Sequence, residues 1–348
     1  MAPPPSPPAH GSPTTAPTSL TLVVLNCYLI PSFYVRYLSL VGDPLAVLSC
    51  RDQALRAERV AELVRAHDVA CLQEVWGGAT DVLQRALDRD ASVRTVARGW
   101  CGVLGTGLLA ETGNTLRTQL LRTGGLFHAY KPRAATVVWF THITFAFNAG
   151  EELMNKSASF QVYDASARWG AGASLLVVNT HLHSPEPFGA TKARVAQRAE
   201  MVDVLRSLPG LPELAAVDWS RCAGLLVGDL NTASAPRGAW NVAETPSEEY
   251  VATLREFDAR DLFVHNDRPG PQDVHTFDAR NSYVDEKALK DASRMDYVLA
   301  LGSLPGADAS APRVPLMRVR AKRCDVLAPS AGQEPSDHHA HSVELVVE

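Results

Sequence analysis

The sequence predicts a mixed α/β fold, and two patterns along the chain support this prediction. Short runs of apolar and β-branched residues recur after residue 20, and each ends abruptly in polar residues. Runs of this length and composition are typical of buried strands. Between them lie segments whose apolar residues are spaced by three and four, the pattern of one buried helix face. Strands that alternate with helices, with some strands paired as hairpins, indicate an α/β architecture.

The elements can be placed along the chain from these two patterns. In order, we predict a strand at 21–28, a helix at 52–68, a strand at 68–76, a helix at 79–90, a strand at 173–184, a helix at 191–208, and strands at 222–232, 293–301 and 341–348. No repeat of fixed period and no internal linker interrupts this series. One domain over residues 20–348 is therefore the simplest division.

The first nineteen residues differ from the rest of the chain. Residues 1–19 contain seven prolines and lack the apolar core of a signal peptide. Proline removes backbone donors and fixes φ, so we expect a disordered tail here. The most apolar later stretch, residues 134–147, is shorter than the roughly 20 residues that span a bilayer. We therefore expect a soluble protein whose membrane contact is peripheral at most.

Composition narrows the functional classes. The chain has 348 residues, 46% of them hydrophobic, and a formal net charge of −5. Nucleic acid is not the expected partner, because nucleic-acid binding favours basic surfaces. The six cysteines show no CxxC spacing, and Cys27 and Cys71 lie in apolar runs. Reduced, buried thiols are their ordinary role, which indicates a reducing compartment and a cytoplasmic protein.

Polar residues gather where the predicted strands end, which is where α/β folds place their binding groups. Taken singly, each is explained as a turn residue, but the whole set is not. The candidates are Asn26, Glu74, His181, Asp229, Asn231, Asp296, Asp337 and His338.

Glu74 and Asn26 suggest a cation site. Glu74 follows an apolar run, and a carboxylate in that place suits a hard cation such as Mg²⁺. Asn26 could add a carbonyl oxygen or hold a water molecule. The alternatives are a surface Glu in a turn and a hydrogen-bonded Asn at a strand end.

The stretches GDLN and NTHLH each place two polar residues two positions apart. Asp229 and Asn231 should point to one side if both are extended, as should His181 and His183. An Asx turn is the alternative for the first pair. A zinc site built on the second pair lacks a third ligand at useful spacing. We prefer His181 as a hydrogen-bond donor to a phosphoryl oxygen and His183 as a structural residue.

The stretches RMDYV and SDHH complete the set. A carboxylate beside an imidazole raises its basicity and fixes its tautomer, which makes a histidine a general base. The alternative for SDHH is a polar turn before an edge strand. We expect His339 and His341 to lie away from any catalytic pair, because of the turn or of alternation in the strand that follows.

Six motifs, LNCY, LQEVW, NTHLH, GDLN, RMDYV and SDH, together resemble the endonuclease/exonuclease/phosphatase superfamily. They run from residue 25 to 338. The resemblance implies a DNase I-like fold, a four-layer αββα sandwich of two mixed β-sheets flanked by helices. FHAY (127–130), NKSAS (155–159) and the residues after THLH resemble neutral sphingomyelinases. Ser157 departs from that branch, which has Gly there, and the segment 31–52 is longer than expected.

The resemblance also implies a role for each candidate. Glu74 would be the main Mg²⁺ ligand, with Asn26 beside it and Asp337 supporting an outer-sphere metal site or the catalytic pair. Mn²⁺ is the alternative cation.

The remaining five candidates take catalytic roles in the same scheme. His338 would be the general base towards water, oriented by Asp296. His181 and Asn231 would stabilise charge on the phosphoryl group, and Asp229 would position groups around it and help to protonate the leaving oxygen.

These roles imply a Mg²⁺-dependent phosphodiesterase that hydrolyses sphingomyelin to ceramide and phosphocholine at a membrane surface. The aromatic stretches 31–40 and 134–147 are candidates for touching that membrane, with hairpin packing as the alternative for the second. Two other functions stay open. One is a hydrolase of the same fold acting on a lysophospholipid or DNA, and the other is an inactive relative that binds lipid or protein.

Overall fold

The computed structural model describes most of the chain between Thr18 and Glu348. The ranges described are 18–29, 52–96, 125–146, 156–184, 190–234, 246–267, 275–277, 281–284, 293–308, 310–330 and 332–348. Residues 1–17 and most of the segment 31–52 lie outside these ranges. β1 begins at Ser19, so this residue belongs to a strand, and the predicted tail boundary was one residue too late.

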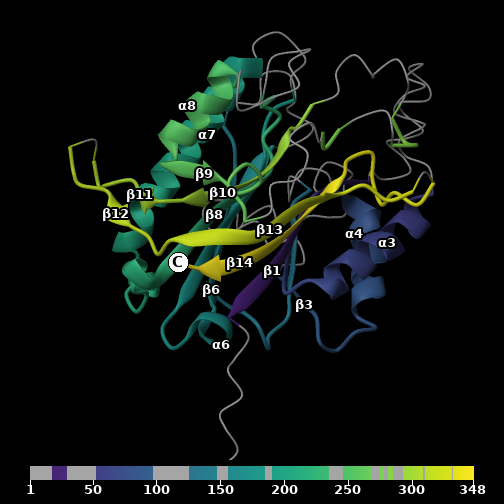
Figure 1. Ribbon diagram of the computed structural model, residues 1–348, viewed down its shortest axis with the longest axis horizontal. Helices are drawn as coiled ribbons and strands as arrows, with labels where there is room; N and C mark the ends of the chain where they lie inside the picture. Colours follow the sequence, from purple (N-terminus) through teal and green to yellow (C-terminus); the bar gives the residue numbers. More distant parts are fainter. Residues whose placement is uncertain are drawn as a thin grey trace, which may run out of the picture.

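Two six-stranded sheets form the centre of the molecule (Figure 1). The first has the order β13-β14-β1-β2-β4-β3. In this sheet β1 and β2 are parallel, and all other neighbouring strands are antiparallel. Its strands are β1 (Ser19–Leu29), β2 (Val69–Val75), β3 (Arg94–Val96), β4 (Phe127–Tyr130), β13 (Val319–Leu327) and β14 (Ala340–Val347).

The second sheet has the order β5-β6-β7-β8-β10-β9, and β7 and β8 are its parallel pair. Its strands are β5 (Thr136–Thr144), β6 (Ser157–Asp164), β7 (Ser174–His181), β8 (Cys222–Asp229), β9 (Ala259–Asp261) and β10 (Asp296–Leu301). A small separate ladder joins β11 (Ser303–Leu304) to β12 (Val314–Pro315).

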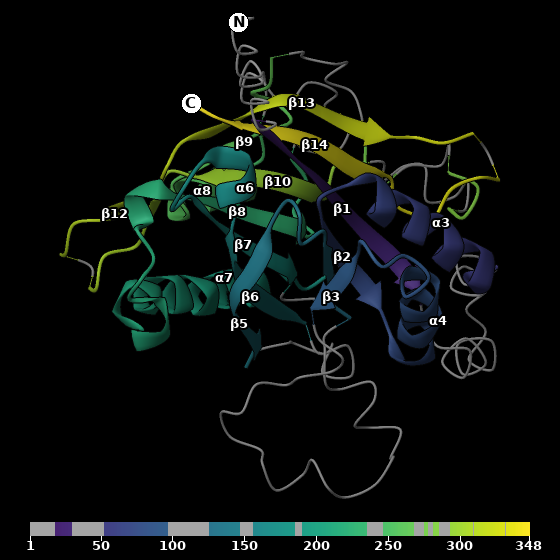
Figure 2. The same cartoon turned by 90° about the horizontal axis from the view of Figure 1, so that it is seen from below.

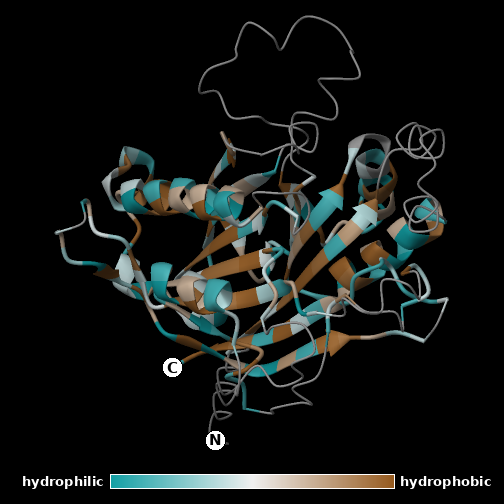
Figure 3. Cartoon of the chain, turned by 90° about the horizontal axis from the view of Figure 1, so that it is seen from above, coloured by the Kyte–Doolittle hydropathy of each residue, from teal (hydrophilic) through white to brown (hydrophobic). Residues whose placement is uncertain are grey.

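Alternation along each strand divides the core into layers. In β1, Leu20, Leu22 and Val24 pack between the two sheets, whereas Val23 and Leu25 face the helices outside. In β7, Leu175 and Val177 face the first sheet. Figure 3 shows the resulting apolar strands between partly polar helices. The odd residues of β7 and the even residues of β1 therefore share the space between the sheets.

Helices cover the outer face of each sheet (Figure 2). α3 (Gln53–Ala66) and α4 (Gly77–Leu87) pack on the first sheet through residues such as Val60 and Leu83. α7 (Ala190–Ser207) and α8 (Glu248–Glu256) pack on the second through residues such as Met201 and Tyr250. Shorter elements are α6 (Ser166–Trp169) and the 3₁₀ turns Leu208–Gly210, Pro212–Leu214 and Trp219–Arg221. The expected four-layer αββα sandwich is confirmed.

The stretch 134–147 contains β5, an edge strand that pairs antiparallel with β6. Hairpin packing, one of the two interpretations from sequence, is therefore what its described part shows. Among the described residues, none of the helices combines the length and apolar character needed to cross a bilayer. The described cysteines, Cys27, Cys71, Cys222 and Cys324, are buried and unpaired with one another.

Candidate active site

Strand register in the second sheet aligns three of the candidate residues in one row. His181 of β7 pairs with Asp229 of β8, and Asp229 pairs with Asp296 of β10. On the other side, Ser157 of β6 pairs with His181. Alternation places all four side chains on the face towards the first sheet, beyond the apolar residues of the same strands. The row closes one end of the space between the sheets.

The first sheet contributes Asn26 and Glu74 from the ends of two neighbouring strands. Asn26 Nδ2 lies 3.2 Å from Glu74 Oε1 and 3.0 Å from Asp229 Oδ2, so it connects the two sheets. Regular alternation in β2 would turn Glu74 towards the helices, with Leu72. Its left-handed backbone, with φ of 54°, breaks that alternation and directs the carboxylate to Asn26.

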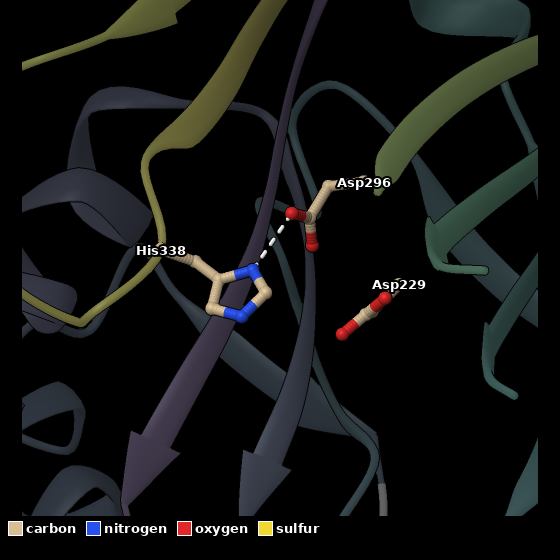
Figure 4. Close-up of side chains that lie close together, drawn as sticks. All are labelled: Asp229, Asp296 and His338. Atoms are coloured by element: carbon tan, nitrogen blue, oxygen red, sulfur yellow. Dashed lines mark hydrogen bonds and ion pairs between the residues drawn. The ribbon is translucent and has the colours of Figure 1, made fainter. Parts of the chain in front are cut away.

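The loop before β14 brings the last two candidates to the same place. Ser336 Oγ lies 2.5 Å from the carbonyl oxygen of Asn26 and 3.0 Å from Asp337 Oδ1. The imidazole of His338 lies beside Asp296, the first residue of β10, and its Nδ1 is 2.8 Å from Asp296 Oδ2 (Figure 4). The structure thus joins Asp296 and His338 directly, with Asp229 on the neighbouring strand.

The charges of this pair depend on its surroundings. Burial lowers the pKa of His338, but the carboxylates of Asp296, Asp337 and Asp229 outweigh burial and raise it to about 10. Burial opposes ionisation of Asp296, yet the charge and hydrogen bond of His338 hold its pKa below the ordinary value. In this state the two groups form a buried ion pair.

Two other carboxyl groups ionise less readily than usual. Burial raises the pKa of Glu74 to about 7, against the opposing charge of Lys156. Burial and the charge of Asp296 raise the pKa of Asp229 to about 6. A positive charge placed between such groups would favour their ionised forms.

Lys156 is a site residue to which the sequence analysis gave no role. Its side chain is buried, and its Nζ lies 2.5 Å from Nε2 of His181. The same Nε2 is 3.5 Å from Glu74 Oε1 and 3.6 Å from Asp229 Oδ2. The signal in the sequence was its position next to Ser157, the residue that pairs with His181. Lys156 could be recognised as a site residue only once the register between β6 and β7 was known.

The donor set at Glu74 fits a hard cation. Glu74 Oε2 is buried and has no hydrogen-bond partner among the described residues. A buried carboxylate oxygen without a partner is costly unless a cation or donor meets it, and carboxylate oxygens are preferred ligands of Mg²⁺. Asp229, Asp296 and His338 are a second possible group, with ligand atoms within 4.8 Å of one another. There, Nδ1 of His338 contacts Asp296, so Nε2 is the ring nitrogen that remains to face a cation.

The geometry of Asn231 differs from the extended arrangement assumed from sequence. β8 ends at Asp229, and Asn231 has a φ of 49°. Its backbone N–H donates to Asp229 Oδ1 at 2.8 Å, and its Nδ2 donates to the carbonyl oxygen of Leu182 at 2.9 Å. The Asx turn, the alternative considered for this stretch, is what the backbone adopts. Asn231 still lies beside Asp229, through the turn rather than through alternation.

His183 and His341 are both buried, with different consequences. The backbone N–H of His183 donates to Gln197 of α7 at 2.9 Å, outside the row of site residues. Nε2 of His341 lies 3.0 Å from the carbonyl oxygen of Asp296. The expectation that His341 lies away from the catalytic pair was therefore wrong. β14 packs against β10 closely enough to bring its ring to the backbone of Asp296.

A family comparison extends over most of the chain. The model of the endonuclease/exonuclease/phosphatase family matches residues 45–338. A search of curated proteins found no significant match.

Solved structures share the fold at low sequence identity. An endonuclease/exonuclease/phosphatase from Bacteroides vulgatus is 16% identical, with a TM-score of 0.60 over 95% of this chain and 100% of that one. A sphingomyelinase C from Streptomyces griseocarneus is 18% identical, with a TM-score of 0.58 over 94% and 99%. A mannosyl-6-phosphatase from Bacteroides thetaiotaomicron is 16% identical, with a TM-score of 0.56 over 94% and 99%.

The family match covers more than half of the chain, and the fold and the placement of the polar residues at the strand ends agree with it. The protein therefore belongs to the endonuclease/exonuclease/phosphatase family, whose members are typically hydrolytic phosphoesterases.

Proposed function

We propose that the protein is a Mg²⁺-dependent phosphodiesterase that hydrolyses sphingomyelin to ceramide and phosphocholine at a membrane surface. One structural observation supports this type of reaction. A buried Asp–His pair, Asp296 and His338, lies close enough to Glu74 for the charge of His338 to affect the Glu74 carboxylate, one oxygen of which is buried without a hydrogen-bond partner among the described residues. A base and a cation site side by side are the two parts that hydrolysis of a phosphodiester needs.

Glu74, with Asn26 beside it and Asp337 nearby, would hold Mg²⁺, which when bound supplies positive charge next to the phosphoryl oxygens. Mn²⁺ suits the same oxygen donors. The raised pKa of Glu74 fits this role, because binding a cation favours the ionised carboxylate that burial opposes.

His338 acts as the base in this scheme, and Asp296 fixes its tautomer by accepting from Nδ1. Nε2 is then the atom that takes a proton from the attacking water. At a pKa of about 10 the ring carries a proton at neutral pH, and the carboxylates around it are the cause. Neutralising Asp337 or Asp229 therefore brings the pKa of His338 towards the range in which it can accept a proton.

Lys156 takes over the donor role first predicted for His181. The ammonium group donates to Nε2 of His181, so His181 accepts at this atom and holds Lys156 in place. The positive charge of Lys156 lies beside Glu74 and Asp229, where it would stabilise negative charge on the phosphoryl group. Asp229, with its pKa raised to about 6, can hold a proton for the leaving oxygen. Asn231 stays next to Asp229 through the turn they share and adds a polar side chain there.

The choice of a sphingolipid rests on sequence motifs, since the likeness to the Streptomyces sphingomyelinase C bears on the fold alone. FHAY, NKSAS and the residues after THLH resemble that branch. A phospholipid substrate implies peripheral contact with a membrane, and we place the protein in the cytoplasm. The stretch 31–40 that could make this contact lies outside the described residues.

The test is release of phosphocholine from sphingomyelin liposomes, with and without Mg²⁺, by the full-length protein. Liposomes of lysophosphatidylcholine and plasmid DNA are the parallel substrates. Turnover of sphingomyelin that disappears on chelation supports the proposal. Faster turnover of lysophospholipid or DNA would reassign the substrate, and no turnover of any of them would favour an inactive relative.

A further inference from the structure

Arg56 is a charged residue of helix α3 that is completely buried, and it takes no part in the scheme above. Its side chain is fully buried, although arginine is seldom found so deep in a protein. Arg56 Nη2 lies 2.6 Å from the carbonyl oxygen of Cys27 and 3.3 Å from that of Tyr28. Its Nε lies 3.1 Å from the carbonyl oxygen of Pro335. One guanidinium group therefore joins two segments that are far apart in sequence.

The first segment is an irregular end of β1. The pairing of β1 with β2 shifts register between Asn26 and Leu29, and Tyr28 has a φ of 45°. A bulge of this kind turns backbone groups out of the regular ladder and re-aims the side chains beside it. The carbonyl groups that Arg56 binds belong to this bulge, directly after Asn26, whose side chain reaches Glu74 and Asp229.

The second segment is the loop that carries Asp337 and His338. Arg56 binds it at Pro335, and Ser336 then reaches back from the loop to the carbonyl oxygen of Asn26. Arg59, one turn further along α3, also contacts this loop, with its Nη1 3.1 Å from the carbonyl oxygen of Glu334. Within the described part of the chain, Arg59 has no hydrogen bond to β1, so of these two arginines it is Arg56 that connects both segments.

Further contacts hold the guanidinium in one orientation. It lies over the ring of Tyr283, 4.7 Å from the centroid. Burial of a charge is costly unless its donors are satisfied, and a planar guanidinium can donate in several fixed directions at once. A lysine in this place would present a single charged point and could not span both segments in the same way.

We propose that Arg56 is a positioning residue, which sets the placement of the loop bearing Asp337 and His338 relative to Asn26 at the end of β1. It acts through the backbone and touches none of the reacting groups. The role in turnover rests on the proposed phosphodiesterase function, whereas the role in fixing the loop does not.

The kinetic test compares Arg56→Lys with two controls on the same helix. Arg59→Gln removes a contact to the loop but none to β1. Val60→Ala removes a buried apolar group and lowers stability without removing a hydrogen bond to either segment. The probe is bis(p-nitrophenyl) phosphate with Mg²⁺, a soluble diester that needs no membrane.

For Arg56→Lys we expect kcat to fall by about 10²-fold, because small displacements of catalytic groups have effects of that size. KM should change by less than about twofold, since Arg56 does not contact the substrate. Both controls should keep kcat within about twofold of wild type at temperatures well below their Tm. Wild-type kcat in Arg56→Lys, or an equal loss in Val60→Ala, would overturn the proposal.

Hydrogen exchange of the same variants gives an answer that needs no substrate. Backbone amides in residues 334–339 should exchange faster in Arg56→Lys than in wild type or Val60→Ala, while amides of β8 stay unchanged. Unchanged exchange in 334–339 would overturn the positioning role by itself. A wild-type protein that does not hydrolyse the probe would instead count against the proposed function.

A second variant covers the case in which Arg56→Lys does not fold. Tyr283→Leu keeps Arg56 but removes the ring over which its guanidinium lies. We expect a smaller loss of kcat, about tenfold, with faster exchange in the same loop. Wild-type kcat and wild-type exchange in a folded Tyr283→Leu protein would contradict the proposal.

Discussion

Nδ1 of His338 lies 2.8 Å from Oδ2 of Asp296, although 41 residues separate them in the chain and they approach from different sheets. Both side chains are buried. A hydrogen bond to Nδ1 leaves Nε2 as the atom that can accept a proton. Nε2 is therefore the nitrogen through which His338 would act as a base, and the first prediction tests that role.

His338→Ala should lower turnover by about 10²–10⁴-fold, the usual contribution of a general base. Residues that act as a unit are not additive, so Asp296→Asn combined with His338→Ala should be little worse than His338→Ala alone. Steady-state kinetics on sphingomyelin liposomes measure both. Additive losses in the double variant would show that the pair does not work as a unit.

Glu74→Gln should lose Mg²⁺-dependent turnover and Mg²⁺ binding by calorimetry, because the ligand charge is removed while the shape is kept. The metal-free variant should also be more stable than wild type at pH 8. The raised pKa of Glu74, about 7, means that ionising this carboxyl opposes folding as pH rises through that range. Glu62→Gln, on the exposed side of α3, is the control and should match wild type. Mg²⁺ binding retained by Glu74→Gln would remove Glu74 from the cation site.

Lys156→Met should reduce kcat by about 10²-fold, the effect of removing one donor that stabilises charge in the transition state. The fold should persist, because a buried charge is replaced by an apolar chain of similar length. Thermal unfolding and kinetics of the same preparation separate the two effects. A folded variant with wild-type kcat would exclude Lys156 from catalysis.

His128, the histidine of FHAY, should make the protein sensitive to acid. Its Nε2 lies 2.7 Å from Ser159 Oγ between the two sheets, and burial lowers its pKa to about 3. Below pH 6.5 His128 binds a proton in the unfolded chain but not in the folded protein. The free energy of unfolding therefore falls as pH drops towards the pKa that His128 has in the folded protein. Between pH 6.5 and 5, one such histidine lowers the free energy of unfolding by about 2 kcal/mol.

Urea unfolding of wild type and His128→Gln at pH 7.5 and 5 measures this contribution. The variant should lose less stability on acidification than wild type, by about 2 kcal/mol. His265→Asn replaces an exposed histidine and should behave as wild type does. Equal losses in all three proteins would show that His128 is not the acid-sensitive group.

His341→Phe should lower kcat moderately, by about tenfold, because the hydrogen bond to the carbonyl of Asp296 is lost while the ring shape is kept. An unchanged KM is expected, since His341 touches the backbone of Asp296 and not the substrate. An unchanged kcat would show that the contact between His341 and the carbonyl of Asp296 does not affect the catalytic pair.

Sequence patterns were enough to place six of the strands, β1, β2, β7, β8, β10 and β14, and the helices α3, α4 and α7, whereas α8 and strands such as β9 and β13 were not predicted. Alternation along a strand is a local property, so His181 and Asp229 could be assigned to strand ends and to one side of their strands, and Asp296 to a strand end. The motifs added the four-layer fold through resemblance. None of this required contacts between distant segments.

The tertiary structure decided how those residues meet. The left-handed backbone of Glu74 turns its carboxylate away from the face that alternation predicts, and the strand of Asn231 ends two residues before it. Lys156, His341 and Arg56 enter the site region or its support only because strand register and helix packing bring them there. Alternation along a strand depends on neighbouring residues alone, whereas register, backbone strain and the contact of two sheets are settled by packing across the whole core.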